Sequence, residues 1–246
     1  MIISVSTAKG GEGKTTTAYF LGSYLIRNGH KVLFVDMDPQ NSLSFLLFQK
    51  YNIAYDDDMV DISKFLVDPA RNQPIFLCEN ADILPSSFKL ASLRTMGSNF
   101  LKNKLSTILH KYEYVVIDTS PSFDNFFIAS NYAADIVVYP IYIRSNMSIK
   151  TFLISMRQLK EEGHVDIISK FKLLCTKYDH TETEDYYISS LREAIEDNDD
   201  SLFFKTKIPF SRRLINVQNN PNNEKLKTFD MVMDLYKPLF EEIINS

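Results

Sequence analysis

Short apolar runs alternate along the chain with longer segments in which apolar residues recur every three or four positions. The runs are rich in β-branched and aromatic residues, which suits parallel strands covered by helices on both faces. They predict strands over residues 2–5, 32–35, 114–117, 136–143 and 171–175. The alternation therefore predicts an α/β fold, with a doubly wound, mostly parallel sheet flanked by helices and right-handed connections.

The segments with helical periodicity predict helices over residues 16–28, 101–110, 148–159 and 225–244. Gly29 suits the end of the first helix, and Pro238 is expected to kink or split the last one because proline lacks a backbone N–H. No linker marks a boundary, so we expect one domain over residues 1–246. Acidic stretches are expected to be exposed loops, with a metal site in the first as the alternative; they span residues 51–61, 181–185 and 196–200.

Composition and charge disfavour several classes of protein. The net charge of −4 gives no overall basic field, so any DNA contact needs a local patch. Cys78 and Cys175 lack metal-ligand spacing and are expected to be buried free thiols. No apolar stretch reaches the roughly 18 residues of a spanning helix. The N-terminus begins with a predicted strand rather than a signal sequence. These features favour a cytoplasmic protein.

The strongest motif is Lys-Gly-Gly-Glu-Gly-Lys-Thr-Thr-Thr at residues 9–17, between a predicted strand and a predicted helix. Glycines let backbone N–H groups point at phosphate oxygens, and the helix that follows presents its positive N-terminus. Lys14 can reach the β- and γ-phosphates, and the Thr15 hydroxyl can bind Mg²⁺. The motif predicts a Mg²⁺-dependent nucleotide site whose binding residues are Gly10, Gly11, Glu12, Gly13, Lys14, Thr15 and Thr16.

The start of this loop resembles the deviant Walker A motif of the ParA/MinD family of P-loop ATPases, Lys-Gly-Gly-x-Gly-Lys-Thr-Thr. General phosphate loops have glycine where this chain has Ala8. The resemblance implies that Lys9 reaches across the interface of an ATP-bound homodimer to the partner's nucleotide, as an arginine finger does. Replacing Lys9 is then expected to spare nucleotide binding by one chain and to impair dimer formation. Glu12 stands where the family has a small or apolar residue, and we expect its side chain to point outward.

Two aspartate motifs each follow a predicted strand, Asp36-Met-Asp38-Pro-Gln and Asp118-Thr-Ser-Pro. The carboxyl ends of such strands open onto the ligand crevice, where carboxylates commonly meet the Mg²⁺ shell. The resemblance implies that Asp38 positions the attacking water. It implies a metal region formed by Thr15, Asp36 and Asp118, and catalytic roles for Lys9, Lys14 and Asp38. It also implies that Thr176 and Pro209 lie beside the adenine.

The resemblance leaves two functions open. ParA-like proteins bind nonspecific DNA as ATP dimers, hydrolyse ATP slowly when alone, and are stimulated by a centromere-binding partner of ParB type. A partition ATPase would associate with the nucleoid. Basic residues expected to contact DNA are Arg192, Lys205, Lys207, Arg212 and Arg213. The alternative is a MinD-like or cargo-positioning nucleotide switch without a DNA role. The acidic tail, with Glu241 and Glu242, disfavours a membrane-binding helix, and we expect no membrane contact.

Overall fold

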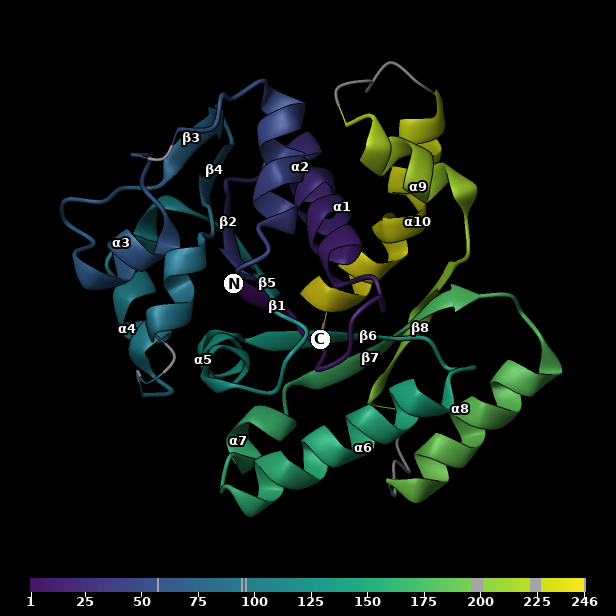
Figure 1. The fold of residues 1–246 in the computed structure, drawn as a ribbon. Helices are drawn as coiled ribbons and strands as arrows, with labels where there is room; N and C mark the ends of the chain where they lie inside the picture. Colours follow the sequence, from purple (N-terminus) through teal and green to yellow (C-terminus); the bar gives the residue numbers. More distant parts are fainter. Residues whose placement is uncertain (57, 94, 96, 196–200, 222–226, 246) are drawn as a thin grey trace.

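Eight strands form one sheet in the order β3-β4-β2-β5-β1-β6-β7-β8 in the computed structural model (Figure 1). The structure describes residues 1–56, 58–93, 95, 97–195, 201–221 and 227–245. Among them, neighbouring strands pair in parallel except at the β3–β4 edge, which is antiparallel. The doubly wound, mostly parallel sheet is therefore confirmed. Its strands are β1 Ile2–Val5, β2 Val32–Met37, β3 Ile75–Cys78, β4 Ala81–Leu84, β5 Tyr114–Thr119, β6 Ile136–Ile141, β7 Phe171–Tyr178 and β8 Phe203–Pro209.

All five predicted strands are present, although β6 ends two residues before the predicted limit, at Ile141. The pattern missed β3, β4 and β8. Strands β3 and β8 are the two edges of the sheet, and the short β4 lies between β3 and β2. Asp82 interrupts the apolar run of β4 and polar residues interrupt that of β8, whereas β3 is a run of only four apolar residues on a partly buried edge.

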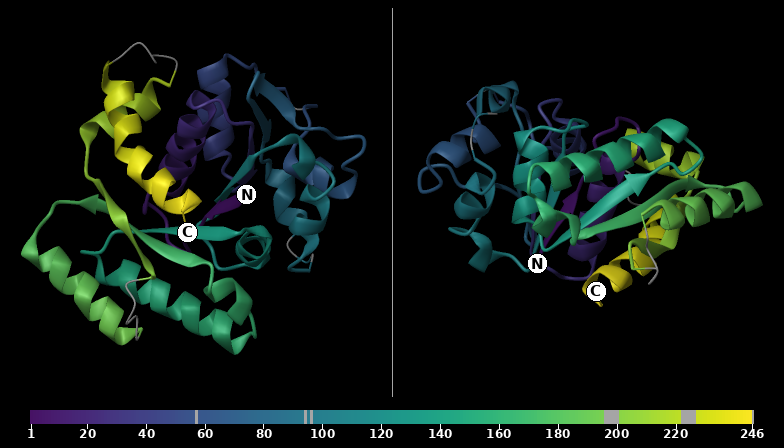
Figure 2. Two further views of the ribbon diagram at one scale, coloured as in Figure 1. Left: turned by 180° about the vertical axis from the view of Figure 1, so that it is seen from behind. Right: turned by 90° about the horizontal axis from the view of Figure 1, so that it is seen from below.

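Helices cover both faces of the sheet (Figures 1 and 2). One apolar core joins the sheet to α1, α2, α9 and α10, and a second core joins its other face to helices α3 to α8. The helices are α1 Lys14–Arg27, α2 Ser42–Tyr51, α3 Ile62–Val67, α4 Phe100–Leu105, α5 Asn125–Ala133, α6 Asn146–Glu161, α7 Val165–Ile168, α8 Glu182–Ala194, α9 Arg212–Asn219 and α10 Lys227–Ile244, with 3-10 turns η1 Phe88–Leu93 and η2 Leu109–Lys111.

The four predicted helices correspond to α1, α4 with η2, α6 and α10. Gly29 follows the C-cap of α1 with a left-handed φ of 84°, as expected. Of the two outcomes expected for Pro238, a split is wrong, because α10 runs continuously through the proline, and a kink stays a prediction. The carbonyl that Pro238 leaves without a donor belongs to exposed Asp234, which water can satisfy. The predicted start of this helix, residues 225–226, lies outside the described residues.

The acidic stretches have different outcomes. Asp56 and Asp58 are exposed in a loop, as predicted. The prediction of a loop at 181–185 is wrong, because Thr181 and Glu184 form a capping box that starts α8. The stretch 196–200 lies outside the described residues. Within the part of the chain that the structure describes, no group of three or more His, Cys, Asp or Glu side chains could hold a metal.

Helix α1 lies unusually close to β2. An ideal Cβ on Gly22 would fall 2.1 Å from the Cε1 atom of Phe34, so the aromatic ring rests directly on the helix backbone. Only glycine permits this approach. The contact fixes the height of α1 above the sheet, and with it the loop that precedes the helix.

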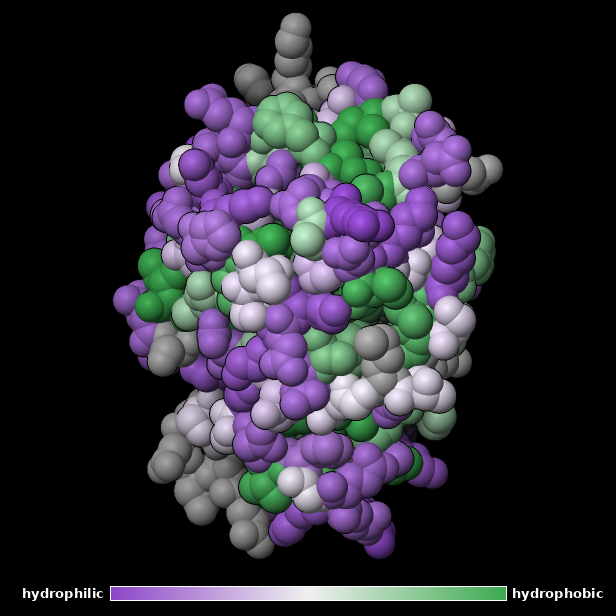
Figure 3. Space-filling model, turned by 90° about the vertical axis from the view of Figure 1, so that its left-hand side faces the viewer, coloured by the Kyte–Doolittle hydropathy of each residue, from purple (hydrophilic) through white to green (hydrophobic). Residues whose placement is uncertain are grey.

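The remaining features of the fold are its molecular surface and its two cysteines. Hydrophilic side chains cover most of the side of the molecule seen in Figure 3, with apolar areas scattered between them. In the described ranges, no helix is both long and apolar enough to cross a membrane. Both cysteines are free. Cys175 is buried, and burial raises the pKa of its thiol to about 12, whereas Cys78 is only partly buried.

Candidate functional site

The predicted motifs meet at one edge of the sheet, where the parallel strands β1, β2, β5, β6 and β7 end. The loop of residues 6–13 leaves β1 and leads directly into α1. The Asp36 and Asp118 motifs stand at the ends of the two strands beyond β1, in register with each other. This edge is the ligand-binding position of open α/β sheets.

The loop has the backbone that a phosphate cradle requires. Gly11 and Gly13 have φ values of 78° and 94°, in the left-handed region that favours glycine. Gly13 is the N-cap of α1, and it provides no side-chain cap. The first turn of α1 also lacks an acidic residue. Since neither an N-cap side chain nor an acidic first-turn residue neutralises it, the positive end of α1 favours an anion.

Lys14 is the central cation of the site. Its side chain is buried, with only 7% of the residue exposed. Burial lowers the pKa of its ammonium, while the charges of Asp118, Asp38 and Glu12 raise it. The Nζ atom lies 3.5 Å from the backbone oxygen of Lys9. An ammonium held so deeply at an uncapped helix start is placed to receive a polyanion.

Asp36 holds the loop that follows β2. Its Oδ1 accepts a hydrogen bond of 3.0 Å from the backbone N–H of Asp38. Its Oδ2 accepts bonds of 2.9 and 2.7 Å from the backbone N–H and the hydroxyl of Ser44. Burial raises the pKa of Asp36 to about 6 against these stabilising bonds. Both oxygens thus accept bonds from protein donors, one of which is the backbone N–H of Asp38, and the metal role expected for Asp36 stays a prediction.

Asp118 has the opposite surroundings. It is buried, yet neither carboxylate oxygen has a partner at hydrogen-bonding geometry among the described residues. Burial raises its pKa well above the ordinary value, the charge of Asp36 adds to this, and the nearby Thr15 hydroxyl lowers it. Two unpartnered carboxylate oxygens beside a threonine hydroxyl fit a Mg²⁺ ion, which takes one or two protein oxygens and completes its shell with water and phosphate.

Asp38 lies at the mouth of the site. Its Oδ1 accepts a bond of 3.0 Å from the backbone N–H of Gln40, and its own N–H is held by Asp36. Burial raises the pKa of Asp38, and the Lys14 charge lowers it. Its carboxylate is therefore oriented by the loop and lies within the field of Lys14.

The expectation that Glu12 points outward is wrong. Only 2% of the residue is exposed, and its carboxylate accepts bonds from three groups. The backbone N–H of Tyr142 lies 2.6 Å from Oε2, and the Ser148 hydroxyl lies 2.8 Å from Oε1. The third donor is the ammonium of Lys9, which forms an ion pair with Oε1. These donors compensate the burial of the charge, so the side chain can turn inward.

Lys9 is consequently held within its own chain. Besides Glu12, its ammonium donates a bond of 3.1 Å to the hydroxyl of Ser148 on α6. Its side chain remains 30% exposed. No sequence pattern marks Ser148, because a serine on a predicted amphipathic helix is an ordinary residue. The backbone N–H of Tyr142 carries no side-chain signal at all.

Residues at the end of β7 also hold the phosphate loop through hydrogen bonds to its backbone. The Thr176 hydroxyl donates a bond of 3.0 Å to the backbone oxygen of Glu12. Lys177, in a left-handed conformation with φ 56°, donates through Nζ to the backbone oxygen of Gly11 at 2.8 Å. Pro209 ends the neighbouring strand β8 in register with Tyr178. Thr176 therefore contacts the loop itself. Lys177 also contacts the loop, although it was not among the expected site residues.

The five expected DNA contacts do not form one patch. Arg192 stacks on the ring of Phe203 at the start of β8, with its guanidinium carbon 5.1 Å from the ring centroid. Lys207 is engaged by Tyr178 and Asp185, at 2.7 and 3.3 Å. Lys205 is exposed on β8, and the exposed Arg212 and Arg213 lie beyond the other end of that strand, in the first turn of α9.

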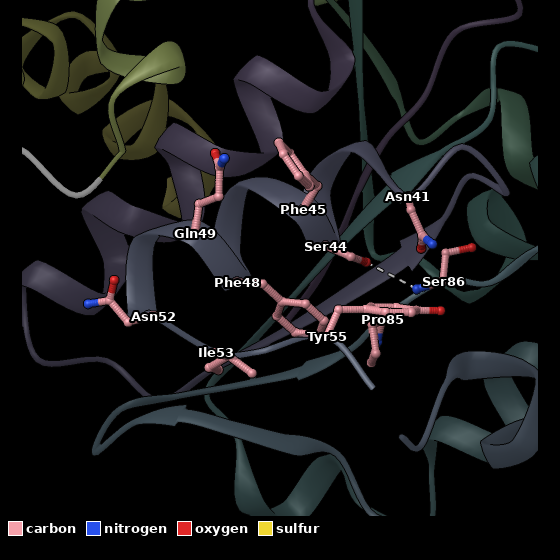
Figure 4. Close-up of a pocket in the computed structure, with 10 residues that line it drawn as sticks. All are labelled: Asn41, Ser44, Phe45, Phe48, Gln49, Asn52, Ile53, Tyr55, Pro85 and Ser86. Carbon is pink, nitrogen blue, oxygen red and sulfur yellow. Dashed lines mark hydrogen bonds between the residues drawn. The ribbon is translucent and has the colours of Figure 1, made fainter. Parts of the chain in front are cut away.

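A separate cavity of about 580 Å³ lies beside α2 (Figure 4). Aromatic rings of Phe45, Phe48 and Tyr55 line it. The Ser44 hydroxyl that binds Asp36 also accepts a bond of 3.1 Å from the backbone N–H of Ser86 at its wall. The residues of the phosphate loop do not line this cavity. The cavity therefore adjoins Ser44, which holds Asp36, rather than the phosphate loop.

Comparison with known proteins supports this geometry. A family profile described as an AAA domain matches residues 1–169. The chain is 30% identical over 230 residues to the sporulation initiation inhibitor protein Soj of Bacillus subtilis, covering 87% of this chain and 85% of that protein. It is 33% identical over 142 residues to the maintenance of carboxysome distribution protein A of Gloeothece citriformis, covering 55% and 54%.

A solved structure shares the fold. It is described as a plasmid partition protein of Borrelia burgdorferi bound to AMPPNP, and it is 24% identical with a TM-score of 0.77. The match covers 99% of this chain and 98% of the other. The loop of residues 9–17, the two aspartate motifs and these similarities agree, and the chain belongs to the ParA/MinD family of P-loop ATPases.

Proposed function

We propose that this chain binds ATP with Mg²⁺, forms a homodimer in that state, binds DNA without sequence preference and hydrolyses ATP slowly to drive partition of DNA. The observation that carries the proposal is the buried Lys14 ammonium beside the unpartnered Asp118 carboxylate at an uncapped helix start. A buried ammonium and a buried carboxylate at the positive end of a helix call for ligands of both signs. A magnesium triphosphate supplies both.

Each residue of the site has a role in this proposal. Lys14 binds the β- and γ-phosphates, while the Thr15 hydroxyl and Asp118 hold the metal. Bound Mg²⁺ neutralises phosphate charge and so favours phosphoryl transfer. Asp38 orients the attacking water, and Asp36 keeps Asp38 in place through its backbone N–H. These roles are assigned by resemblance to the family, and they are consistent with the geometry of the loop.

The base is proposed to lie near the ends of β7 and β8. Thr176 and Pro209 stand at these ends, and Thr176 contacts the phosphate loop through the oxygen of Glu12. A purine attached to a triphosphate in residues 10–16 extends toward neighbouring strand ends of the same sheet edge.

DNA binding is proposed for Arg212 and Arg213. Both are exposed in the first turn of α9, where a positive charge opposes the helix dipole. Helix stability therefore does not explain their position, whereas contact with phosphate does. Dimerisation would double the number of such contacts. A partner protein of ParB type is proposed to stimulate hydrolysis, and the chain would then lie on the nucleoid.

A DNA gel shift with and without ATP tests this function. The wild type is expected to shift DNA of any sequence only with ATP, and Lys14→Ala is expected to lose the shift. The Arg212→Glu, Arg213→Glu double variant should weaken binding and reduce its salt dependence, because fewer counterions are released. Arg71→Glu is the matched control, since Arg71 is exposed and its side chain pairs only loosely with Asp68 at 3.5 Å. Binding that ignores ATP would contradict the proposal.

The second function is a nucleotide switch that positions a protein cargo without DNA. One observation favours it: Lys207 and Arg192 are engaged within the chain, which leaves a small basic surface on a protein of net charge −4. The relative from Gloeothece citriformis is named for carboxysome distribution. The gel shift run beside sedimentation with anionic liposomes, both with ATP, separates DNA binding from membrane binding. Loss of both signals in a protein that still hydrolyses ATP would favour the cargo switch.

A further inference from the structure

The ammonium of Lys9 and the carboxylate of Glu12 form an ion pair inside one chain. We propose that Glu12 is a latch that holds Lys9 in its own chain and thereby sets the concentration at which two chains assemble around nucleotide. The inference rests on the proposed ATP-bound dimer, in which Lys9 reaches the nucleotide of a second copy. It concerns Glu12 and Ser148, which that proposal does not use.

Glu12 is built into the structure as a fixed acceptor. Its carboxylate is buried and is anchored independently of Lys9 by Tyr142, after β6, and by Ser148, on α6. Its backbone oxygen is held by Thr176 on β7. A carboxylate anchored by Tyr142 and Ser148, on a residue whose backbone oxygen is also held, cannot follow Lys9 when the lysine moves. The ion pair therefore has to break if Lys9 leaves.

Lys9 is held from two sides but remains accessible. Glu12 and Ser148 both accept bonds from its ammonium, while 30% of the side chain is exposed to solvent. A lysine side chain has a flexible four-carbon stem, so its ammonium can move outward without movement of the loop backbone. The bonds to Glu12 and Ser148 are thus the barrier between the held and the extended lysine.

The latch acts twice in a symmetric dimer, because each copy gives up its own ion pair. Hydrogen bonds that involve a charged group are stronger than neutral ones, and a partly buried pair is weakly screened by salt. Removing the charge of Glu12 is expected to lower the midpoint concentration of dimer formation about tenfold, which corresponds to about 1.4 kcal/mol.

The decisive variant is Glu12→Gln. It keeps the side-chain volume and an oxygen that can accept from Tyr142, and it removes the charge that binds Lys9. Ser148→Ala removes the second acceptor of Lys9 and is expected to lower the midpoint less, in the same direction. Glu193→Gln is the matched control, because it makes the same charge change at an exposed position of α8.

The midpoint is measured by sedimentation equilibrium over a range of protein concentrations with Mg²⁺ and with AMPPNP at a concentration that saturates every variant. AMPPNP prevents hydrolysis, and saturation keeps differences in nucleotide affinity from moving the midpoint. Thermal melting establishes that each variant is folded. The latch requires a lower midpoint in Glu12→Gln and no further gain when this change is added to Lys9→Ala. It is overturned if wild type dimerises and Glu12→Gln has an equal or higher midpoint, while the proposed function then stands.

Two further results are also decisive. A wild type that stays monomeric with nucleotide at every concentration overturns the proposed dimer and the latch together. If Glu12→Gln does not fold, Ser148→Ala decides alone, because the latch predicts a lower midpoint for it and an unchanged midpoint contradicts the latch.

Discussion

Asp36 of β2 and Asp118 of β5 are register partners on adjacent parallel strands, and both are buried. Their surroundings differ: Asp36 accepts three hydrogen bonds from the protein, whereas the oxygens of Asp118 have no such partner among the described residues. Burial raises the pKa of both. One carboxylate therefore supports the site, and the other is left to meet a ligand.

This pair makes the stability of the protein without nucleotide depend on pH. The pKa of Asp36 is about 6 in the folded protein against an ordinary value of 3.8, so the folded state binds more protons between these values. The free energy of unfolding is expected to fall as the pH rises through this interval, and the raised pKa of Asp118 extends the fall to higher pH. Urea unfolding at a series of pH values measures it. Stability that rises over the same interval would contradict the assignment.

Asparagine substitutions separate the two acids. Asp118→Asn removes a buried charge whose oxygens have no partner at hydrogen-bonding geometry among the described residues. It is therefore expected to raise the melting temperature at about pH 8 by a few degrees, since 1 kcal/mol corresponds to about 2–4 °C at this size. Asp36→Asn turns an amide donor toward N–H groups and is expected to lower it. Asp118→Asn should also abolish the Mg²⁺-dependent part of the stabilisation by ATP. Equal destabilisation by both variants would argue against the different roles.

The ion pair of Lys9 alters one expectation from the sequence. Lys9→Ala leaves the Glu12 charge uncompensated, and that charge is close enough to raise the pKa of Lys14. The variant is therefore expected to weaken ATP binding by a single chain about tenfold, the order of an interaction between charges several ångströms apart near a surface. The double change Lys9→Ala, Glu12→Gln should restore the affinity. Titration calorimetry below the dimer midpoint checks this, and undiminished affinity in Lys9→Ala would show that Glu12 does not repel the nucleotide.

Gly22→Ala tests the close packing of α1 on β2. Alanine would favour the helix by about 1 kcal/mol, but its Cβ collides with the Phe34 ring. Overpacking of this kind costs about 1–3 kcal/mol or more, so a net loss of stability is expected in urea unfolding. Gly97→Ala is the control, because only the Asn99 Oδ1 atom lies near, at 3.9 Å from the added Cβ. Equal stability of both variants would refute the steric account.

The central strands and the ATP site could be predicted from sequence because their signals are local. Continuous apolar runs marked β1, β2, β5, β6 and β7, and glycine spacing marked the loop before α1. The capping box at Thr181 and Glu184 also has a local sequence signature, Thr-x-x-Glu. The acidic composition of residues 181–185 favours a loop instead, and it masks that signature. Pro238 does not split α10, whose apolar residues pack into the core on both sides of the proline.

The orientation of Glu12 could not be predicted, because its partners are distant in sequence. Tyr142 and Ser148 follow β6, which lies beside β1 only once the sheet has formed. Without them an acid beside a phosphate loop is unfavourable, and pointing outward is the reasonable expectation. The scatter of the basic residues has the same origin, since Lys207 finds Tyr178 and Asp185 across the β7–β8 edge. Side-chain partners of this kind depend on topology.

Titration calorimetry of folded protein with ATP and Mg²⁺ tests the central claim most directly. The account predicts saturable binding of one nucleotide per chain in the wild type and in Lys89→Ala, an exposed lysine control. It predicts at least a hundredfold weaker binding in Lys14→Ala, about 2.7 kcal/mol, because the buried ammonium that pairs with the phosphates is lost. No heat of binding in the wild type, or equal affinity in Lys14→Ala, would contradict the account.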